Sequence, residues 1–178
     1  MIRMFLKASA LLSLGFLVAC GGAAPAETTF PGAPGWYDNP IAGCGVGSAK
    51  HRGNRNLTKE AATSRARRDL TAQLKAKVQG MVKDYAAMGE AEGKEFSEEL
   101  VTSVGRQIVD QTLVGTRVAN SKLVGSEMYV NVCLDPATFA DAFDKMNELS
   151  GKAREALKKR SQAEFADLDA QLAKIKGE

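Results

Sequence analysis

Three glycines at alternate positions, Gly43, Gly45 and Gly47, constrain the fold of this chain more than any other feature. They lie in residues 41–49, an apolar stretch that we expect to form a strand. Because side chains alternate between the two faces of a strand, the glycines leave one face bare and Cys44 lies on the other. A bare face allows a helix or a second strand to approach unusually closely. The sequence therefore predicts a strand with a close backbone neighbour.

A long helix is the expected neighbour, beginning at a cap on Asn56 or Thr58 and ending near Ala87. Its small residues Ala62 and Ala66 suit close packing beside the bare strand face. About ten residues separate the last of the three glycines from this helix, whereas a dinucleotide-binding turn has its glycines at the strand-to-helix junction, so that function is excluded. The apolar positions recur every three or four residues and predict one buried face: Ala62, Ala66, Leu70, Leu74, Val78, Met81, Val82 and Tyr85.

The remaining pattern predicts a second helix, a hairpin and a third helix. The second helix covers residues 94–111, the hairpin strands cover residues 113–123 and 127–134, and Asp135 caps the third helix. We therefore expect an α/β domain of the α+β type, with a small, mostly antiparallel sheet of about three strands packed with helices. Its element order is strand, helix, helix, strand, strand, helix.

Residues 150–178 are expected to form a charged amphipathic helix after this domain. Ser150 and Gly151 interrupt the helical pattern, since a glycine costs about 1 kcal/mol relative to alanine in a helix. From Lys152 to Lys176 the apolar positions again follow a helical period: Leu157, Phe165, Leu168, Leu172 and Ile175. The sequence leaves three roles open for this helix: docking on the domain, contacting a partner, or pairing with a second copy.

Residues 1–19 predict a secretory signal peptide. Arg3 and Lys7 precede an apolar run, residues 8–19, that is too short to span a bilayer. The run ends in Leu17-Val18-Ala19-Cys20, which resembles the lipobox of bacterial lipoproteins. This resemblance implies cleavage before Cys20 and a diacylglyceryl group on its thiol. The mature protein would then be anchored to a membrane without spanning it.

Removal of the signal peptide sets the expected domain organisation. Residues 20–35 are rich in glycine, alanine and proline and predict a lipidated, flexible tether. Residues 36–149 predict a single α/β domain, and residues 150–178 the charged helix. Glycine and not aspartate follows Cys20, which in lipoproteins of two-membrane bacteria favours sorting to the outer membrane.

Positive charge is concentrated in one part of the sequence. The formal net charge is +3, and the signal peptide carries two cations, so the mature chain has a net charge of +1. This value does not indicate a nucleic-acid partner. Six cations nevertheless gather in the loop after the first strand and at the front of the long helix, where they are either a solvated face or candidate anion-binding residues: Lys50, Arg52, Arg55, Arg65, Arg67 and Arg68.

The sequence offers little for catalysis. His51 is the only histidine, and its cationic neighbours favour a solvated side chain over an acid–base or metal-ligating one. No Cys/His set with zinc spacing and no phosphate-binding Gly-x-x-x-x-Gly-Lys motif occurs in the sequence. We expect no enzymatic activity, no catalytic residue, no metal, no small-molecule substrate, and no cofactor apart from the covalent lipid on Cys20.

Cys44 and Cys133 remain as a pair once Cys20 carries lipid. They fall in the first and last predicted strands, which are neighbours if the first helix returns the chain across the sheet. Adjacent strands can bring two Cα atoms within the roughly 4.4–6.8 Å that a disulfide needs. The faces match only if the glycine side of the first strand meets the side of Val130 and Val132. Otherwise the pair would be two free, buried thiols.

These features together resemble the LPP-twenty family of bacterial outer-membrane and surface lipoproteins, to which some flagellar lipoproteins are also similar. The resemblance is carried by the lipobox at Cys20, Pro34-Gly35-Trp36, the run from Gly43 to Ala49, the alanine-spaced helix from Ala61 to Val82, and the strand Tyr129-Val130-Asn131-Val132. It covers the chain from about residue 36 to residue 149 and implies a small α/β domain in the cell envelope without established enzymatic activity.

We therefore expect a lipid-anchored envelope lipoprotein with a non-catalytic structural or protein-interaction role, through an envelope protein partner or through self-association. The alternative is a binding module for an anionic envelope polymer or lipid headgroup, through the six cations of the basic loop and the first helix.

Overall fold

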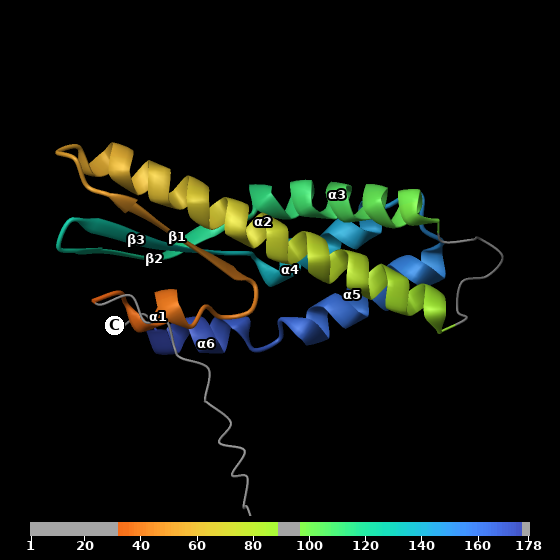
Figure 1. Cartoon of the computed structure of the whole chain (residues 1–178). Coiled ribbons are helices and arrows are strands. Elements are labelled where there is room, and N and C mark those ends of the chain that lie inside the picture. The colour runs from red at the N-terminus through yellow and green to blue at the C-terminus, as the bar shows by residue number, and fades with distance from the viewer. Residues whose placement is uncertain (1–31, 89–96, 176–178) are drawn as a thin grey trace, which may run out of the picture.

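A computed structural model describes residues 32–88 and 97–175 of the chain (Figure 1). The elements in chain order are α1 (Gly35–Asp38), β1 (Cys44–Lys50), α2 (Arg55–Ala87), α3 (Glu98–Val114), β2 (Arg117–Val124), β3 (Glu127–Cys133), α4 (Pro136–Ala142), the 3₁₀ turn η1 (Phe143–Lys145), α5 (Gly151–Glu164) and α6 (Leu168–Ile175). The predicted α+β class and three-stranded antiparallel sheet are confirmed. The predicted signal peptide, Cys20 and residues 20–31 of the tether lie outside the described residues.

The three strands form one antiparallel sheet in the order β1-β3-β2. β1 pairs with β3 so that Gly45 lies opposite Val132 and Gly47 lies opposite Val130. Directly opposite residues of an antiparallel pair project to the same face. The bare face of β1 therefore continues into the valine face of β3, which is the arrangement that a bond between the two cysteines requires.

Cys44 and Cys133 lie directly opposite each other and form a disulfide in the structure. Their Cα atoms are 4.0 Å apart, and both side chains are fully buried. The bond closes the end of the β1–β3 pair at which β3 leaves the sheet. Of the two states that the sequence left open, the structure therefore contains the disulfide and not the free thiols.

α2 packs against the bare face of β1. A Cβ atom built on Gly45 would lie 2.3 Å from the carbonyl oxygen of Ala66, and one on Gly47 would lie 2.4 Å from the carbonyl oxygen of Ala62. Ordinary van der Waals contacts of a Cβ atom begin at 3.4 Å. Only glycine permits this separation between strand and helix, as the alternating glycines predicted.

The buried stripe of α2 winds around the helix axis. Positions at strict four-residue spacing are buried from Thr58 through Val82. Four residues advance an α-helix by about 400°, so each step turns the buried position by about 40°. The N-terminal half of α2 therefore faces the sheet, and its C-terminal half faces α3 and α5 (Figure 1).

The boundary between α3 and β2 differs from the prediction. Ser97 caps α3 by accepting a hydrogen bond from the Leu100 N–H, and the helix continues through Leu113 and Val114. These two residues were assigned to the following strand because their alternation with Gly115 looks extended. The helix continues to the glycine because Leu113 packs against the hydrophobic core from the last turn of α3.

The C-terminal segment docks on the domain. Its core-facing side chains, among them Leu157, Leu168 and Leu172, belong to the same buried cluster as those of the sheet and α2. The prediction of one continuous helix after Ser150 is wrong, because the helix stops at Glu164 and resumes at Leu168. Phe165 occupies the break.

Phe165 explains the break in the C-terminal helix. Its ring makes an edge-to-face contact with Phe139, with centroids 5.3 Å apart. A Cβ atom on Gly43 would lie 3.0 Å from the Phe165 ring, so the ring packs directly over the start of β1. The contact is available only because the chain leaves the helix at this point, and burial of the aromatic side chain offsets the lost helical hydrogen bonds.

Candidate anion-binding surfaces

α2 divides the six candidate cations between two surfaces. Arg65 and Arg67 flank the fully buried Ala66, and neighbouring residues of a helix diverge by about 100°. Arg65 therefore lies on one flank of α2 and Arg67 on the other. The structure does not unite the predicted residues in a single cluster.

One flank carries the corner between β1 and α2. Lys50, Arg52 and Arg65 line a hollow of about 430 Å³ there, which Glu127 also borders. Arg55, in the first turn of α2, lines neither this hollow nor the one on the other flank. We call the exposed side chains of Lys50, Arg52 and Arg55 the basic tip.

The backbone of the basic tip is fixed by its neighbours. The His51 N–H donates a hydrogen bond of 2.7 Å to the carbonyl oxygen of Ser126, in the turn between β2 and β3. Asn54, and not Asn56 or Thr58 as predicted, caps α2: its side chain accepts hydrogen bonds from the backbone N–H groups of Asn56 and Leu57. Gly53 has φ +93°, a conformation that favours glycine. The tip is thus joined to the hairpin and to the helix.

Arg65 has a structural partner. Its guanidinium donates a hydrogen bond to the carbonyl oxygen of Ser48, and one turn later the Asp69 carboxylate accepts a 2.9 Å hydrogen bond from the Val46 N–H. These side chains satisfy backbone groups that an edge strand leaves unpaired. Arg65 therefore closes the free edge of β1, which is a structural role in addition to the anion-binding role predicted for it.

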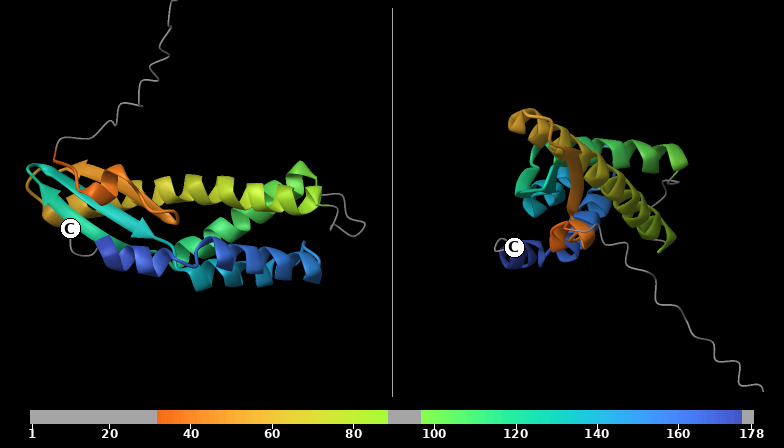
Figure 2. Two further views of the ribbon diagram at one scale, coloured as in Figure 1. Left: turned by 90° about the horizontal axis from the view of Figure 1, so that it is seen from below. Right: turned by 60° about the vertical axis from the view of Figure 1, so that its left-hand side comes forward.

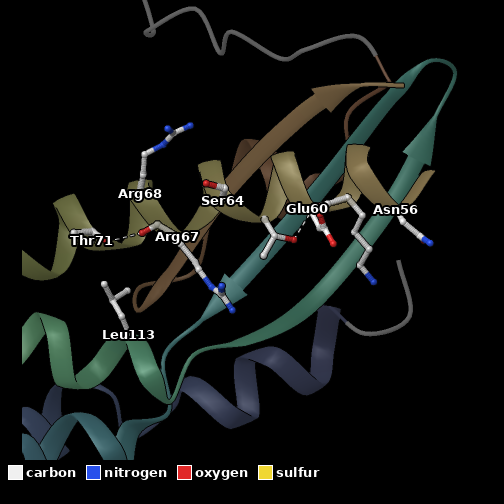
Figure 3. A pocket seen from close by; sticks show the side chains of 9 residues that line it. Asn56, Glu60, Ser64, Arg67, Arg68, Thr71 and Leu113 are labelled. Atoms are coloured by element: carbon white, nitrogen blue, oxygen red, sulfur yellow. Dashed lines mark hydrogen bonds between the residues drawn. The ribbon is translucent and has the colours of Figure 1, made fainter. Parts of the chain in front are cut away.

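The other flank of α2 carries a hollow of about 590 Å³, which we call the α2 groove (Figure 3). Its lining recurs every three or four residues over about four turns of α2, and Leu113 of α3 borders it as well. Figure 3 shows Arg67 extending toward the β2–β3 hairpin and Arg68 pointing away from it. The lining residues are Asn56, Lys59, Glu60, Thr63, Ser64, Arg67, Arg68, Thr71 and Leu113.

Lys59 is a groove residue that the sequence analysis missed. It lies eight residues before Arg67, so the helical repeat brings the two cations to the same flank. That spacing was visible in the sequence. The groove could not be inferred from it, because a groove also requires the neighbouring end of α3.

Ion pairs are formed in one half of the molecule and are missing from the described cations of the basic tip and the α2 groove. Lys158 bridges Asp141 and Asp144 at 2.9 and 2.6 Å, and hydrogen bonds from Lys158 to both carboxylates, Asp144 first, raise the pKa of the lysine. Further pairs join α2, β2 and α3 to their neighbours: Lys77–Glu164, Arg160–Asp84, Lys83–Glu98 and Arg117–Asp169. Within the described parts of the chain, the basic tip and the three cations of the α2 groove form no ion pair.

The sequence interval from position 50 to position 70 accordingly carries a strong local charge. It contains seven Lys or Arg residues and two Asp or Glu residues, a local net charge of +5, whereas the predicted mature chain has +1. The remainder of the mature chain is therefore net negative. The electrostatic field of such an uneven charge distribution attracts anions toward the end of the molecule that carries the cations.

The described residues contain no group of three or more His, Cys, Asp or Glu side chains placed to hold a metal ion. The ring Nδ1 of His51 lies 3.2 Å from the hydroxyl oxygen of Thr58, and the His51 residue is half-buried. Across residues 32–88 and 97–175, none of the helices combines the length and the apolar character needed to cross a membrane.

No protein-family model matches the chain, and no curated protein matches it significantly. The resemblance to the LPP-twenty family thus stays a prediction from the residues quoted for it.

Proposed function

We propose that this chain is a lipid-anchored, non-catalytic lipoprotein of the bacterial envelope with an interaction role, and that its basic tip contacts the anionic headgroups of the membrane that holds the anchor. The observation that carries the proposal is the position at which the described chain begins. Its first residues, which end the predicted tether, lie at the same end of the molecule as the basic tip (Figures 1 and 2).

The entry point of the tether is defined by Gly32. A Cβ atom built on Gly32 would lie 3.5 Å from a side-chain carbon of Val124, which ends β2 at the hairpin turn. The same turn accepts the hydrogen bond from His51 in the basic tip. Tether, hairpin turn and basic tip therefore converge at one end of the domain.

This convergence decides which surface a lipid on Cys20 would bring to the membrane. Eleven residues lie between Cys20 and Gly32, and a flexible chain of that length has an r.m.s. span of about 20 Å. Attraction to headgroups acts within a Debye length, about 8 Å at physiological salt. The tether is thus short enough to keep the tip near the leaflet and long enough to let it touch the headgroups, where three exposed cations would be attracted to anionic lipid.

The anchor is tested by fractionating cells that make the natural chain or a Cys20→Ser variant. The natural chain should partition with the membrane, and the variant should be released in soluble form. Equal retention of both proteins in the membrane fraction would exclude lipidation as the means of attachment.

The headgroup contact is tested with the Cys20→Ser protein and vesicles that contain or lack phosphatidylglycerol. Each cation near an anionic surface contributes about 1 kcal/mol. Loss of two such attractions in Arg52→Glu/Arg55→Glu should therefore weaken binding at least about thirtyfold, and repulsion of the two new carboxylates should add to this loss. A Lys145→Glu/Lys159→Glu variant makes the same net charge change in η1 and α5, away from the end that carries the tip, and should retain its affinity. Equal weakening in both variants would assign the binding to overall charge.

A further inference from the structure

The α2 groove is not used by the proposed headgroup contact. It lies on the flank of α2 opposite to the hollow of the basic tip, and it leads to the end of α3 and not to the tether. The features that border it suggest a binding site for a protein segment.

The groove continues a face of α2 that is buried farther along the helix. Eighteen residues make five turns of an α-helix, so Glu60 and Ser64 lie on the same face as Val78 and Val82. The two valines are fully buried in the half of α2 that packs against α3 and α5. Glu60 and Ser64 are exposed, because no described helix covers that face in the N-terminal half.

β2 is left uncovered beside this face. α2 packs on β1 and β3, whereas neither α2 nor α3 makes more than marginal contact with β2. Val118, at the start of β2, lies opposite Val132 and so projects to the side of the sheet that α2 occupies. It is 39% exposed, and Val114 at the end of α3 is 89% exposed.

Apolar and cationic groups therefore border the strip of surface between α2, the end of α3 and β2, which we call the lane. Leu113 lines the groove at its α3 end, and the exposed apolar residues Val114 and Val118 follow it closely in the chain. Lys59 and Arg67 line its α2 side, and neither is neutralised by an ion pair with a described residue. The hydroxyl groups of the α2 groove do not alter this charge: those of Thr63 and Thr71 donate to carbonyl oxygens of their own helix.

We propose that the α2 groove and the adjoining apolar residues bind an acidic amphipathic helix of a partner protein. The occupant is assigned by charge complementarity, since three cations and one carboxylate line the groove, and by the apolar surface, which a glycan or a free phosphate would leave uncovered. A helix in this lane would lie beside α2 in line with α3. The inference deepens the proposed interaction role and does not depend on the headgroup contact.

Photo-crosslinking in the envelope of the producing cells tests this assignment. A benzoylphenylalanine replaces Ser64 in the full, lipidated chain, and the crosslinked peptide is sequenced by mass spectrometry. We expect a peptide with net negative charge and apolar residues at helical spacing. A Lys59→Glu/Arg67→Glu variant should reduce the yield about tenfold, which corresponds to about 1.4 kcal/mol, and Lys145→Glu/Lys159→Glu should not.

Each alternative outcome counts against the acidic helix. A crosslink to lipid, to a glycan or to a second copy of the chain would assign the groove to that occupant, and the absence of a crosslink would leave the groove without a protein partner; either result overturns the inference. A neutral Lys59→Gln/Arg67→Gln variant should give an intermediate yield, which separates loss of attraction from damage to the fold. Membrane attachment is scored in the same cells, so failure of the groove and failure of the anchor are read separately.

Discussion

Replacing Gly45 with alanine tests the contact on which the fold is built. General propensity favours the change, because glycine in a strand costs roughly 0.5–1 kcal/mol relative to alanine. The structure predicts the opposite sign, because the new methyl group would lie 2.3 Å from the Ala66 carbonyl oxygen and 2.4 Å from the Leu70 nitrogen. Both atoms belong to helix backbone, which cannot rotate away as a side chain can.

The size of the effect follows from these distances. To restore an ordinary contact of 3.4 Å, α2 must move away from β1 by about 1 Å. A radial gap of 0.5–1 Å forfeits about a quarter to a half of the dispersion energy of the facing atoms, and Ala62, Ala66 and Leu70 are all fully buried at this contact. Overpacking of ordinary core sites costs about 1–3 kcal/mol. We expect about 3 kcal/mol or more here, a large part of the 5–15 kcal/mol typical of a domain.

Urea unfolding followed by circular dichroism measures this loss, with Gly80→Ala as the matched control. Gly80 also lies in α2, but a Cβ atom built on it would meet nothing within 4 Å. The control should therefore gain roughly 0.5–1 kcal/mol from helix propensity. If Gly45→Ala unfolds within about 1 kcal/mol of the natural chain, the glycine does not set the distance between α2 and β1 and the reasoning fails.

Three further predictions concern the disulfide, a helix cap and the C-terminal segment. Reduction of the Cys44–Cys133 bond, which spans 89 residues, should lower the free energy of unfolding by about 4 kcal/mol; equal urea midpoints with and without reductant would contradict this. Asp135→Ala should cost about 1 kcal/mol at neutral pH, whereas Asp135→Asn keeps the cap but not the charge. The hydrogen bond from the Thr138 N–H is the main reason that the pKa of Asp135 is lowered. The charge of Asp135 therefore stabilises the fold above the unfolded-state pKa, and this contribution is lost as pH falls through the folded-state pKa. The difference in stability between the natural chain and Asp135→Asn should shrink in acid. Leu172→Ala should cost about 2–4 kcal/mol by thermal or urea unfolding if α6 is docked, and under about 0.5 kcal/mol if it is a free surface helix.

The parts of the fold that were predictable depend on local pattern. Alternating glycines beside an alanine-spaced helix predict that α2 packs on β1, and the register of the pair then settles the face of Cys44. Errors arose where a long-range contact overrides the local pattern. Phe165 has ordinary helical spacing in the sequence, yet it leaves the helix to meet Phe139, and no local signal contains that partner.

The candidate site was predictable as a set of charges and not as a surface. The six cations stand close together in the sequence, but their division between two flanks depends on which side of α2 meets the sheet. The role of Arg65 depends on the free edge of β1, where it meets the Ser48 carbonyl. Both facts follow from tertiary arrangement, so charge density alone could not supply them.

The winding of the buried stripe on α2 connects the fold to the proposed binding surfaces. Because strict four-residue spacing turns the buried position by about 40° per step, a single helix packs on the sheet with one half and on other helices with the other half. Cations in the second half, such as Lys77 and Lys83, meet carboxylates of α5 and α3. Those in the first half, such as Arg67, lie beside the sheet and the end of α3, and form no ion pair with a described residue. The unpaired charge at one end of the molecule therefore follows from how the helix is buried, and the acidic partner that we propose would provide the carboxylates that neighbouring helices provide elsewhere.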